Sequence, residues 1–327
     1  MTELEPFPVR ELGRTGLQVS VPGFGGGPVG WRATPDAEAE ADRLMIAAWA
    51  AGIRYFDTAP FYGYGNSERR VGRFLATQAR GSFVLSTKVG RLIRPAFPGD
   101  RSPEQVRFDY SREGVLRSVE ESLERLGTGR IDIALIHDID GWTHGTDQPE
   151  RFRQALEGAY PALAELKAQG LIRAIGLGVN EWQVCEDFAR AVPVDCILLA
   201  GRHSLLQQDA ARQFTPFCAE HGIGLVIGGP YNSGILASGD VDGALYDYAP
   251  AKPEIRQRVR RIQAVADRFG VRLGTAALAF VLRSAPVATV IPGVATVEEL
   301  QTTLAFARAT VPEALWAALV EAGLIMA

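Results

Sequence analysis

Short apolar runs alternate with longer, helix-like segments along most of the chain. Ahead of them, residues 9–12 and 17–20 alternate apolar and polar positions around a turn at 13–16, which predicts a β-hairpin. Eight apolar runs then predict buried strands at residues 21–25, 55–57, 83–88, 131–137, 172–176, 196–200, 224–227 and 289–291. This alternation is typical of β-α-β units, whose strands are parallel.

The segments between these strands carry apolar residues at helical spacing. One stripe, with intervals of four, four and three, consists of Val115, Val119, Leu123 and Leu126. A second stripe, in the next long segment, consists of Leu156, Tyr160 and Leu163. Each stripe predicts a helix that packs one face against the sheet. Thr34 followed by Pro35 predicts a helix start, because threonine caps helices and proline suits their first position.

Eight β-α units without a linker or a shift in composition predict one domain over residues 1–327. Its expected fold class is α/β, a single (β/α)8 TIM barrel with an N-terminal β-hairpin. A doubly wound open sheet is the alternative, but the glycines at 23 and 25–27 do not form G-x-G-x-x-G at a helix start. Two irregular segments, 91–109 and 138–149, follow predicted strands, so we expect extended loops on the C-terminal face, where barrel enzymes build their sites.

Composition excludes several classes of protein. Hydrophobic residues at 47% and charged residues at 22% are ordinary for a globular protein, and the net charge of −4 offers no basic surface to nucleic acid or anionic membranes. No apolar stretch approaches the roughly 20 residues of a membrane span, and the acidic start lacks a signal-peptide core. The three cysteines form no C-x-x-C pair, which argues against disulfides and zinc. We therefore expect a cytoplasmic protein, a monomer or weak homo-oligomer, whose partner is a small molecule.

Ionisable side chains close three consecutive predicted strands. Asp57 ends the second strand and Tyr62 follows five residues later, Lys88 ends the third strand, and His137 ends the fourth. Each of them alone is compatible with a purely structural role. Since strand ends meet at the mouth of a barrel, however, four such residues predict one catalytic group.

The chemistry of this group is coherent. A phenol has a pKa near 10, and a neighbouring Lys88 ammonium is expected to lower the pKa of Tyr62. Asp57 would keep Lys88 charged and oriented, and His137 would hydrogen-bond the substrate oxygen. Tyr62 would then donate a proton to a carbonyl as hydride arrives, or accept one from an alcohol as hydride leaves. The residues thus indicate a soluble oxidoreductase that moves hydride to or from a carbonyl or an alcohol.

Over nearly all of its length the chain resembles the aldo-keto reductase family. The motifs that carry the resemblance occur in order: ELGRTGLQVS, AGIRYFDTAPFYGYGNSERRVG, FVLSTKVG, SVEESLERLGTGRIDIALIHD, LKAQGLIRAIGLGVN and IPGVATVEEL. The resemblance implies that Asp57, Tyr62, Lys88 and His137 are the family's catalytic tetrad. It also implies an extended nicotinamide dinucleotide bound across the barrel mouth without a Rossmann domain.

The resemblance places the adenosine end of the cofactor at IPGVATVEE, where family members that prefer NADP carry lysine or arginine. This chain has Gly293, Ala295 and Glu299 there, and a carboxylate would repel a 2′-phosphate while accepting hydrogen bonds from ribose hydroxyls. Thr296 and Glu299 also match a capping box. We expect NAD to be preferred, with NADP possible. The expected cofactor-binding residues are Gly26, Asp57, Asn180, Gly228, Pro230, Tyr231, Ile291, Gly293, Thr296 and Glu299.

The motifs IHDID, GRHSLL and GGPYNSG resemble those of the aldose dehydrogenases, a subgroup with D-threo-aldose (L-fucose) 1-dehydrogenases, L-galactose dehydrogenases and pyridoxal 4-dehydrogenases. This implies oxidation of the anomeric hydroxyl of an aldose, of the L-fucose, L-galactose, D-arabinose or D-threo type, to a lactone. Aromatic faces with scattered polar groups suit a sugar, although such residues also simply cover a barrel rim. The expected substrate-binding residues are Trp31, Tyr62, His137, Asp138, Trp142, Arg202 and His203.

Other functions stay open at this point. They are oxidation of pyridoxal, general carbonyl reduction with NADPH, and a regulatory subunit that binds the cofactor without turnover. A Schiff-base enzyme built on Lys88 would leave Tyr62 and Asp57 without a paired role. A metal hydrolase is disfavoured, since none of the four histidines is paired at ligand spacing.

Overall fold

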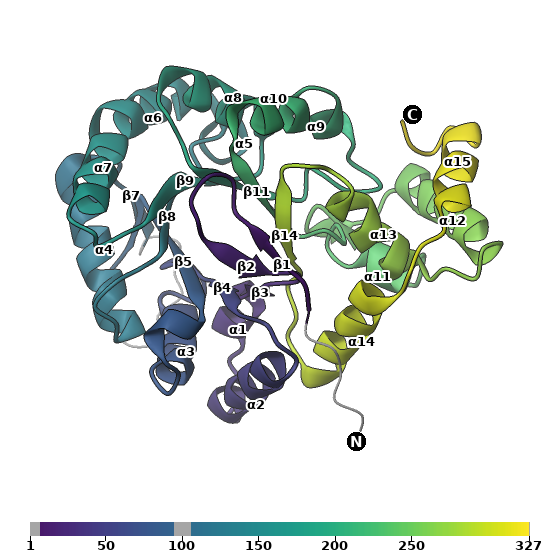
Figure 1. Ribbon diagram of the computed structural model, residues 1–327, viewed down its shortest axis with the longest axis horizontal. Coiled ribbons are helices and arrows are strands. Elements are labelled where there is room, and N and C mark those ends of the chain that lie inside the picture. Colours follow the sequence, from purple (N-terminus) through teal and green to yellow (C-terminus); the bar gives the residue numbers. More distant parts are fainter. Residues whose placement is uncertain (1–6, 95–105, 327) are drawn as a thin grey trace.

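The computed structural model describes residues 7–94 and 106–326. Eight parallel strands form one sheet that curls into a barrel with helices around its outside (Figure 1). In sheet order these strands are β3 (Phe24–Gly25), β4 (Tyr55–Asp57), β5 (Val84–Val89), β8 (Ile133–His137), β9 (Ala174–Val179), β10 (Cys196–Ala200), β11 (Gly224–Gly228) and β14 (Val287–Ile291). A parallel bridge between Gly25 and Gly293 joins the two edge segments. The predicted α/β barrel is confirmed.

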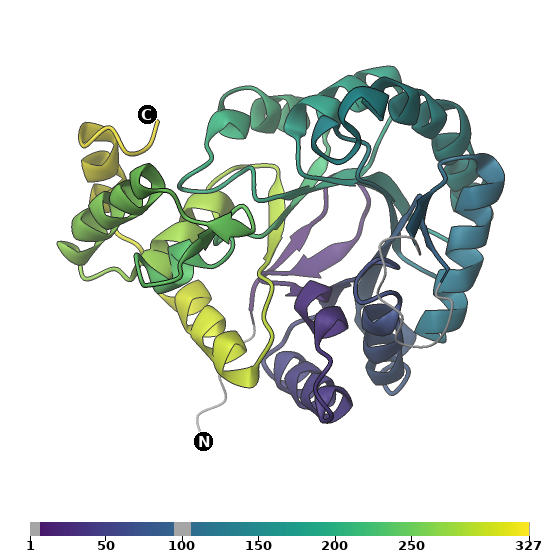
Figure 2. The same cartoon turned by 180° about the vertical axis from the view of Figure 1, so that it is seen from behind.

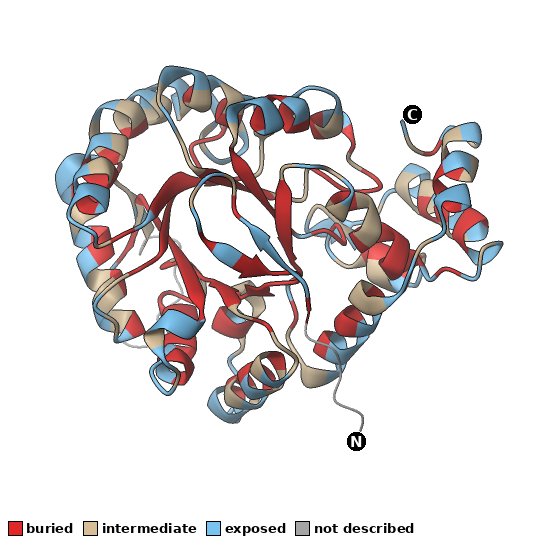
Figure 3. Ribbon diagram, viewed as in Figure 1, coloured by how far each residue is buried: buried red, intermediate tan, exposed pale blue. Residues whose placement is uncertain are grey.

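Helices cover the outside of the barrel, with exposed residues on their outer faces and buried residues toward the sheet (Figure 3). The helices of eight or more residues are α2 (Ala37–Ala50), α3 (Asn66–Leu75), α4 (Arg112–Leu126), α7 (Tyr160–Ala168), α8 (Trp182–Ala191), α10 (Phe214–His221), α12 (Pro253–Asp267), α13 (Leu273–Leu282), α14 (Val297–Arg308) and α15 (Glu313–Glu321). Shorter ones are α1 (Gly27–Trp31), α5 (Gly141–His144), α6 (Gln148–Gln154), α9 (Asp209–Arg212) and α11 (Ile235–Ser238). None in the described ranges is long and apolar enough to cross a membrane.

Helix α4 shows how local sequence sets these elements. Its first turn is capped by Ser111, whose hydroxyl accepts a hydrogen bond from the Gly114 N–H, and it ends at Gly127 in the left-handed region at φ +61°. The predicted stripe of Val115, Val119 and Leu126 is fully buried on the sheet, and Leu123 is partly buried. Each fully buried side chain of this kind stabilises the fold by about 1.5–3 kcal/mol relative to an exposed one.

The predicted N-terminal hairpin closes one end of the barrel. Strands β1 (Val9–Glu11) and β2 (Gln18–Ser20) pair antiparallel, and Leu12, Leu17 and Val19 pack inside with the first residues of the barrel strands. Figure 1 looks onto this hairpin, and Figure 2 views the opposite end. Because the hairpin fills the N-terminal end, a ligand can enter only where the strands finish.

Several boundaries differ from the sequence-based expectations. Helix α2 begins at Ala37 rather than at Thr34–Pro35, because the Thr34 carbonyl closes a turn with the Ala37 N–H and its hydroxyl bonds Glu40 instead of capping. Strand β9 runs three residues beyond the predicted 172–176. The predicted start-cap and strand end were therefore wrong, although the elements themselves are present.

The two segments expected to be irregular are largely structured where they are described. Residues 138–149 contain α5, a 3-10 turn at Gly145–Asp147 and the start of α6. Between α6 and α7 lies a π-helical turn at Ala155–Ala159, which leaves Leu156 and Tyr160 half-buried while Leu163 is fully buried. In 91–109, β6 (Arg91–Ile93) pairs antiparallel with β7 (Val106–Phe108), and residues 95–105 lie outside the described ranges. The described parts of both segments lie on the C-terminal face, as expected.

Candidate active site

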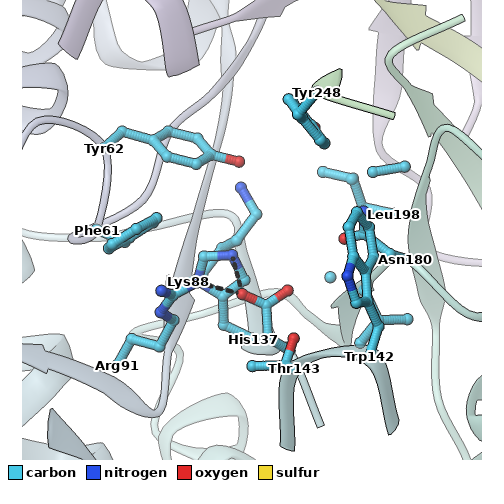
Figure 4. A pocket seen from close by; sticks show the side chains of 14 residues that line it. Phe61, Tyr62, Lys88, Arg91, His137, Trp142, Thr143, Asn180, Leu198 and Tyr248 are labelled. Carbon is cyan, nitrogen blue, oxygen red and sulfur yellow. Dashed lines mark hydrogen bonds and ion pairs between the residues drawn. The ribbon is translucent and has the colours of Figure 1, made fainter. Parts of the chain in front are cut away.

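A pocket of about 340 Å³ opens at the C-terminal ends of the strands. Its lining residues come from five strands with the loops that follow them, and from the segment after β11: Phe61, Tyr62, Lys88, Arg91, His137, Asp138, Trp142, Thr143, Gly178, Val179, Asn180, Leu198, Ala200 and Tyr248. Figure 4 shows Tyr62, Lys88, Arg91 and His137 on one side and Trp142, Asn180, Leu198 and Tyr248 on the other. Three of the four predicted catalytic side chains thus line one pocket.

The fourth, Asp57, lies beneath it and is paired with Lys88. The Lys88 Nζ is 2.8 Å from Asp57 Oδ2 and donates to the Thr58 carbonyl at 2.9 Å, and both side chains are only 1% exposed. Asp57 Oδ1 accepts from the Ser86 hydroxyl at 2.7 Å. Burial opposes the Lys88 charge, but Asp57 and Tyr62 outweigh it and raise the pKa of Lys88. Lys88 is therefore a fixed cation at the base of the pocket.

Gly178 on β9 makes room for this cation. A Cβ at that position would lie 3.1 Å from Lys88 Cε, tighter than ordinary van der Waals contact. Only a residue without a side chain lets the lysine stem cross the barrel to Asp57 unhindered. A glycine of β9 thus makes room for a side chain of β5.

Tyr62 lies next to Lys88, whose Nζ is 4.6 Å from the centre of the phenol ring. Burial raises the pKa of Tyr62, Lys88 lowers it, and the net shift is upward. The expected fall in this pKa was wrong: the lysine acts in the predicted direction, but loss of solvent around the phenol has the larger effect. Tyr62 is consequently a neutral phenol at neutral pH, competent to donate a proton.

His137 faces Tyr62 edge-on, with ring centres 6.2 Å apart. Burial, helped by the Arg91 and Lys88 charges, lowers the pKa of His137 well below its usual value, so the ring is neutral. Its Nε2 lies 3.3 Å from Asp138 Oδ2, while its buried Nδ1 has no hydrogen-bond partner among the described residues. We infer that the ring proton sits on Nε2, where it is available as a donor.

Asp138 and Arg91 form an ion pair inside the pocket that the sequence did not indicate. Arg91 NH1 is 2.5 Å from Asp138 Oδ2, and its guanidinium lies 3.5 Å from the centre of the Phe61 ring. Burial raises the pKa of Asp138 to about 6, although Arg91 opposes the shift. The sequence predicted Asp138 at the site. It gave no signal for Arg91 or Phe61, apart from their positions near Lys88 and Tyr62 along the chain.

The outer rim is built from three loops. Trp142 lies 6.3 Å from Tyr248, measured between ring centres, and the Arg202 guanidinium lies 5.0 Å from the Trp142 ring. Arg202 is also ion-paired to Asp247 at 2.7 Å. Tyr248 and Asp247 form the turn between β12 (Leu245–Tyr246) and β13 (Ala249–Pro250), so only the folded chain brings them to this rim. Arg202, expected to bind substrate, instead supports the rim and does not line the pocket.

Two other predicted substrate-binding residues lie away from the pocket lining. Trp31 packs edge-on against Phe61, with ring centres 5.3 Å apart, so it supports the wall from outside. His203 is buried, hydrogen-bonds the Ser284 hydroxyl through Nε2 at 2.9 Å, and has a pKa lowered to about 4 by burial. Its side chain packs in the core and is not presented to the cavity.

The predicted cofactor residues are spread along the same rim. Asn180 lines the pocket, beside the flat apolar surface of Gly178, Leu198 and Ala200, and its side-chain amide is a donor and acceptor suited to a carboxamide. Gly228 and Ile291 end β11 and β14, with Pro230 just beyond β11. Gly26 donates its N–H to the Asp57 carbonyl at 2.7 Å, and Tyr231 is buried edge-on against Phe306. An amide beside apolar groups is chemically suited to a nicotinamide ring with its carboxamide.

The loop expected at the adenosine end is held by a capping arrangement. Thr296 Oγ1 accepts from the Glu299 N–H at 3.1 Å, and Glu299 Oε2 accepts from the Ala295 N–H at 2.7 Å. The structure also brings Arg32 here, where it donates to the Ala295 carbonyl at 3.1 Å and pairs with Glu40 at 2.6 Å. The charge of this arginine is therefore already balanced by a carboxylate.

Comparison with known proteins identifies the family of the chain. The model of the aldo/keto reductase family matches residues 23–323. The chain is 40% identical to a pyridoxal 4-dehydrogenase from Microbacterium luteolum, covering 97% of both chains. It is 40% identical to a D-threo-aldose 1-dehydrogenase from a Pseudomonas species, over 95% of this chain and 96% of the other. The holo form of an aldo-keto reductase from Bacillus halodurans superimposes with a TM-score of 0.76 at 26% identity, over 94% of this chain and 93% of that one.

Proposed function

The chain belongs to the aldo/keto reductase family and is an oxidoreductase, and on that premise we propose that it oxidises the anomeric hydroxyl of an aldose to a lactone with NAD. The observation that carries the proposal is the composition of the pocket. Next to Tyr62 and His137 it offers a carboxylate and a guanidinium, Asp138 and Arg91, between the aromatic faces of Phe61 and Trp142. Polar groups between aromatic faces suit a polyhydroxylated ring.

In this proposal the tetrad removes the proton from the reacting hydroxyl. His137 donates its Nε2–H to the substrate oxygen and fixes its position. Tyr62, as the phenolate, accepts the hydroxyl proton, and the nearby Lys88 cation stabilises that phenolate. Asp57 keeps the lysine charged and pointing at the phenol. In the reverse direction the neutral Tyr62 returns the proton to a carbonyl oxygen.

The bound nicotinamide supplies the hydride acceptor, and this chain's residues hold it. Asn180 would bind the carboxamide, with Gly178 and Leu198 as the flat wall beside the ring. The preference for NAD is supported by Glu299 in the first turn of α14 and by the pairing of Arg32 with Glu40, which leaves no unpaired cation among the described contacts of Ala295.

Oxidation of pyridoxal is a second candidate, favoured by the tilted pair of Trp142 and Tyr248 at the rim. Aromatic faces of this kind would stack a pyridine ring. The 40% identity to a pyridoxal 4-dehydrogenase supports this candidate as strongly as it supports an aldose.

The test is the formation of reduced cofactor with L-fucose, L-galactose, D-arabinose, D-threose and pyridoxal, each with NAD and with NADP. Turnover of an aldose with NAD supports the proposal in full. Turnover of pyridoxal alone selects the second candidate. A silent panel, together with reduction of aldehydes by NADPH, would overturn the proposed substrate and cofactor while leaving the family assignment unchanged.

A further inference from the structure

One charged pair in the pocket has no role in the proton chemistry of the tetrad. Asp138 directly follows His137 and has a left-handed backbone at φ +50°, uncommon for a residue with a side chain. Two donors hold this conformation. The single proton of the Tyr110 hydroxyl is shared between the carbonyls of His137 at 2.7 Å and Asp138 at 2.9 Å, and the Asp138 N–H donates to the Gly178 carbonyl at 3.0 Å. The fold thus keeps a carboxylate beside the catalytic histidine despite a strained backbone.

The two oxygens of this carboxylate differ in their surroundings. Oδ2 accepts a hydrogen bond from Arg91 at 2.5 Å and lies 3.3 Å from His137 Nε2 without a hydrogen bond to it, which leaves the Nε2–H for the substrate. Oδ1 has no hydrogen-bond donor among residues 7–94 and 106–326, although Asp138 lines the pocket. A carboxylate accepts up to about four hydrogen bonds, so Oδ1 retains capacity for a ligand.

Arg91 holds this carboxylate in place. Its guanidinium is packed 3.5 Å from the centre of the Phe61 ring and 5.0 Å from that of Phe108. With the guanidinium wedged between two rings and paired to Asp138, the carboxylate has little freedom to turn away. It is therefore a preorganised acceptor rather than a mobile surface group.

The location of the acceptor defines what it can bind. His137 Nε2 is the donor for the reacting oxygen in the proposed reaction, and Asp138 is within 3.3 Å of that same nitrogen. A substrate oxygen at Nε2 therefore places the neighbouring carbon's substituent beside the carboxylate. A hydroxyl there can donate to Asp138, a hydrogen there leaves the carboxylate unsatisfied, and an anionic group there is repelled.

We propose that Asp138, positioned by Arg91, selects substrates that carry a hydroxyl on the carbon next to the reacting carbon. The inference rests on the proposed oxidation of an aldose, for which this is the 2-hydroxyl. In pyridoxal the carbon next to the reacting carbon is a ring carbon without a hydroxyl, so the inference applies to aldoses. Arg91 is a positioning residue in this scheme, and Asp138 makes the contact.

The experiment compares kcat/KM for D-arabinose and for its 2-deoxy analogue in four proteins: wild type, Asp138→Asn, Arg91→Met and the control Asp242→Asn. Asparagine tolerates the left-handed backbone, so Asp138→Asn is expected to fold. Asp242 is fully exposed, and its substitution removes the same charge. Wild type and control should favour the hydroxylated sugar by about 10- to 100-fold, since a hydrogen bond to a charged group is lost with the deoxy sugar. Both pocket variants should reduce this ratio to a few-fold.

The ratio of the two kcat/KM values distinguishes a loss of substrate selection from a general structural defect, because a structural defect lowers both values together. A wild-type ratio near one, or an unchanged ratio in Asp138→Asn, would overturn the inference. If no sugar is oxidised, the proposed function fails and the inference is tested separately, by reduction of 2-hydroxypropanal against propanal. Preference for the hydroxyaldehyde that depends on Asp138 would then support it. Faster turnover of a 2-carboxylated aldehyde, lost in Arg91→Met, would instead make Arg91 an anion-binding group and refute it.

Discussion

Replacing Lys88 with methionine tests the central ion pair of the site. Methionine keeps most of the volume of the lysine stem but removes the cation that lies 2.8 Å from Asp57. Both side chains are 1% exposed, so the aspartate would be left as an unpaired buried charge. Loss of one partner from a buried pair costs about 3–5 kcal/mol. We expect a decrease in the free energy of unfolding of that size near neutral pH.

The loss of unfolding free energy in Lys88→Met should increase as the pH rises. Burial raises the pKa of Asp57, and in the variant the opposing effect of Lys88 is gone. A carboxyl whose folded pKa is above its unfolded value of about 3.9 stabilises the protein below that value and loses this effect as pH rises through the folded pKa. The variant should therefore come closest to wild type in acid and fall behind as pH increases.

The free energy of unfolding is measured with urea at acidic and at neutral pH. The proteins compared are the wild type, Lys88→Met and the double variant Lys88→Met/Asp57→Asn. The double variant should recover part of the lost stability, because it removes the buried charge as well as its partner. A Lys88→Met deficit below about 1 kcal/mol, or one that does not change with pH, would refute the reasoning that a buried unpaired carboxylate dominates. Turnover offers a second readout, since the phenolate of Tyr62 loses its stabilising cation.

The remaining predictions concern the reaction. Tyr62→Phe should lower kcat by at least about 100-fold with nearly normal cofactor binding measured by fluorescence, since only proton transfer is lost; retention of most turnover would contradict its role. Because the pKa of Tyr62 is raised, oxidation should accelerate about tenfold per pH unit above neutrality while phenolate is scarce, and a flat profile with a rate-limiting chemical step would argue against it. The KM for NADP should exceed that for NAD, and an equal or lower value would show that Glu299 does not discriminate between them.

The sequence predicted the position of a side chain best where the residue lies at the end of a strand. Asp57 and Lys88 could be paired from sequence, because neighbouring parallel strands finish at one edge and their register follows from the apolar runs. Tyr62 and His137 were located by the same reasoning. His203 was not, since a residue three positions beyond Ala200 can face either the cavity or the helices, and its ring packs against Phe280 of α13, away from the cavity.

The order of apolar runs and helical stripes by itself determined the barrel, and the polar residues at or just beyond the ends of its strands indicated the proposed catalytic group. Both are local properties, because strand and helix periodicity and the direction of parallel strands depend on neighbouring residues. Only the tertiary structure decided the Arg91–Asp138 pair, the contact of Tyr248 with Trp142, and the net upward pKa shift of Tyr62. These depend on loop paths and on how much solvent the assembled pocket excludes, which are set when distant segments pack together.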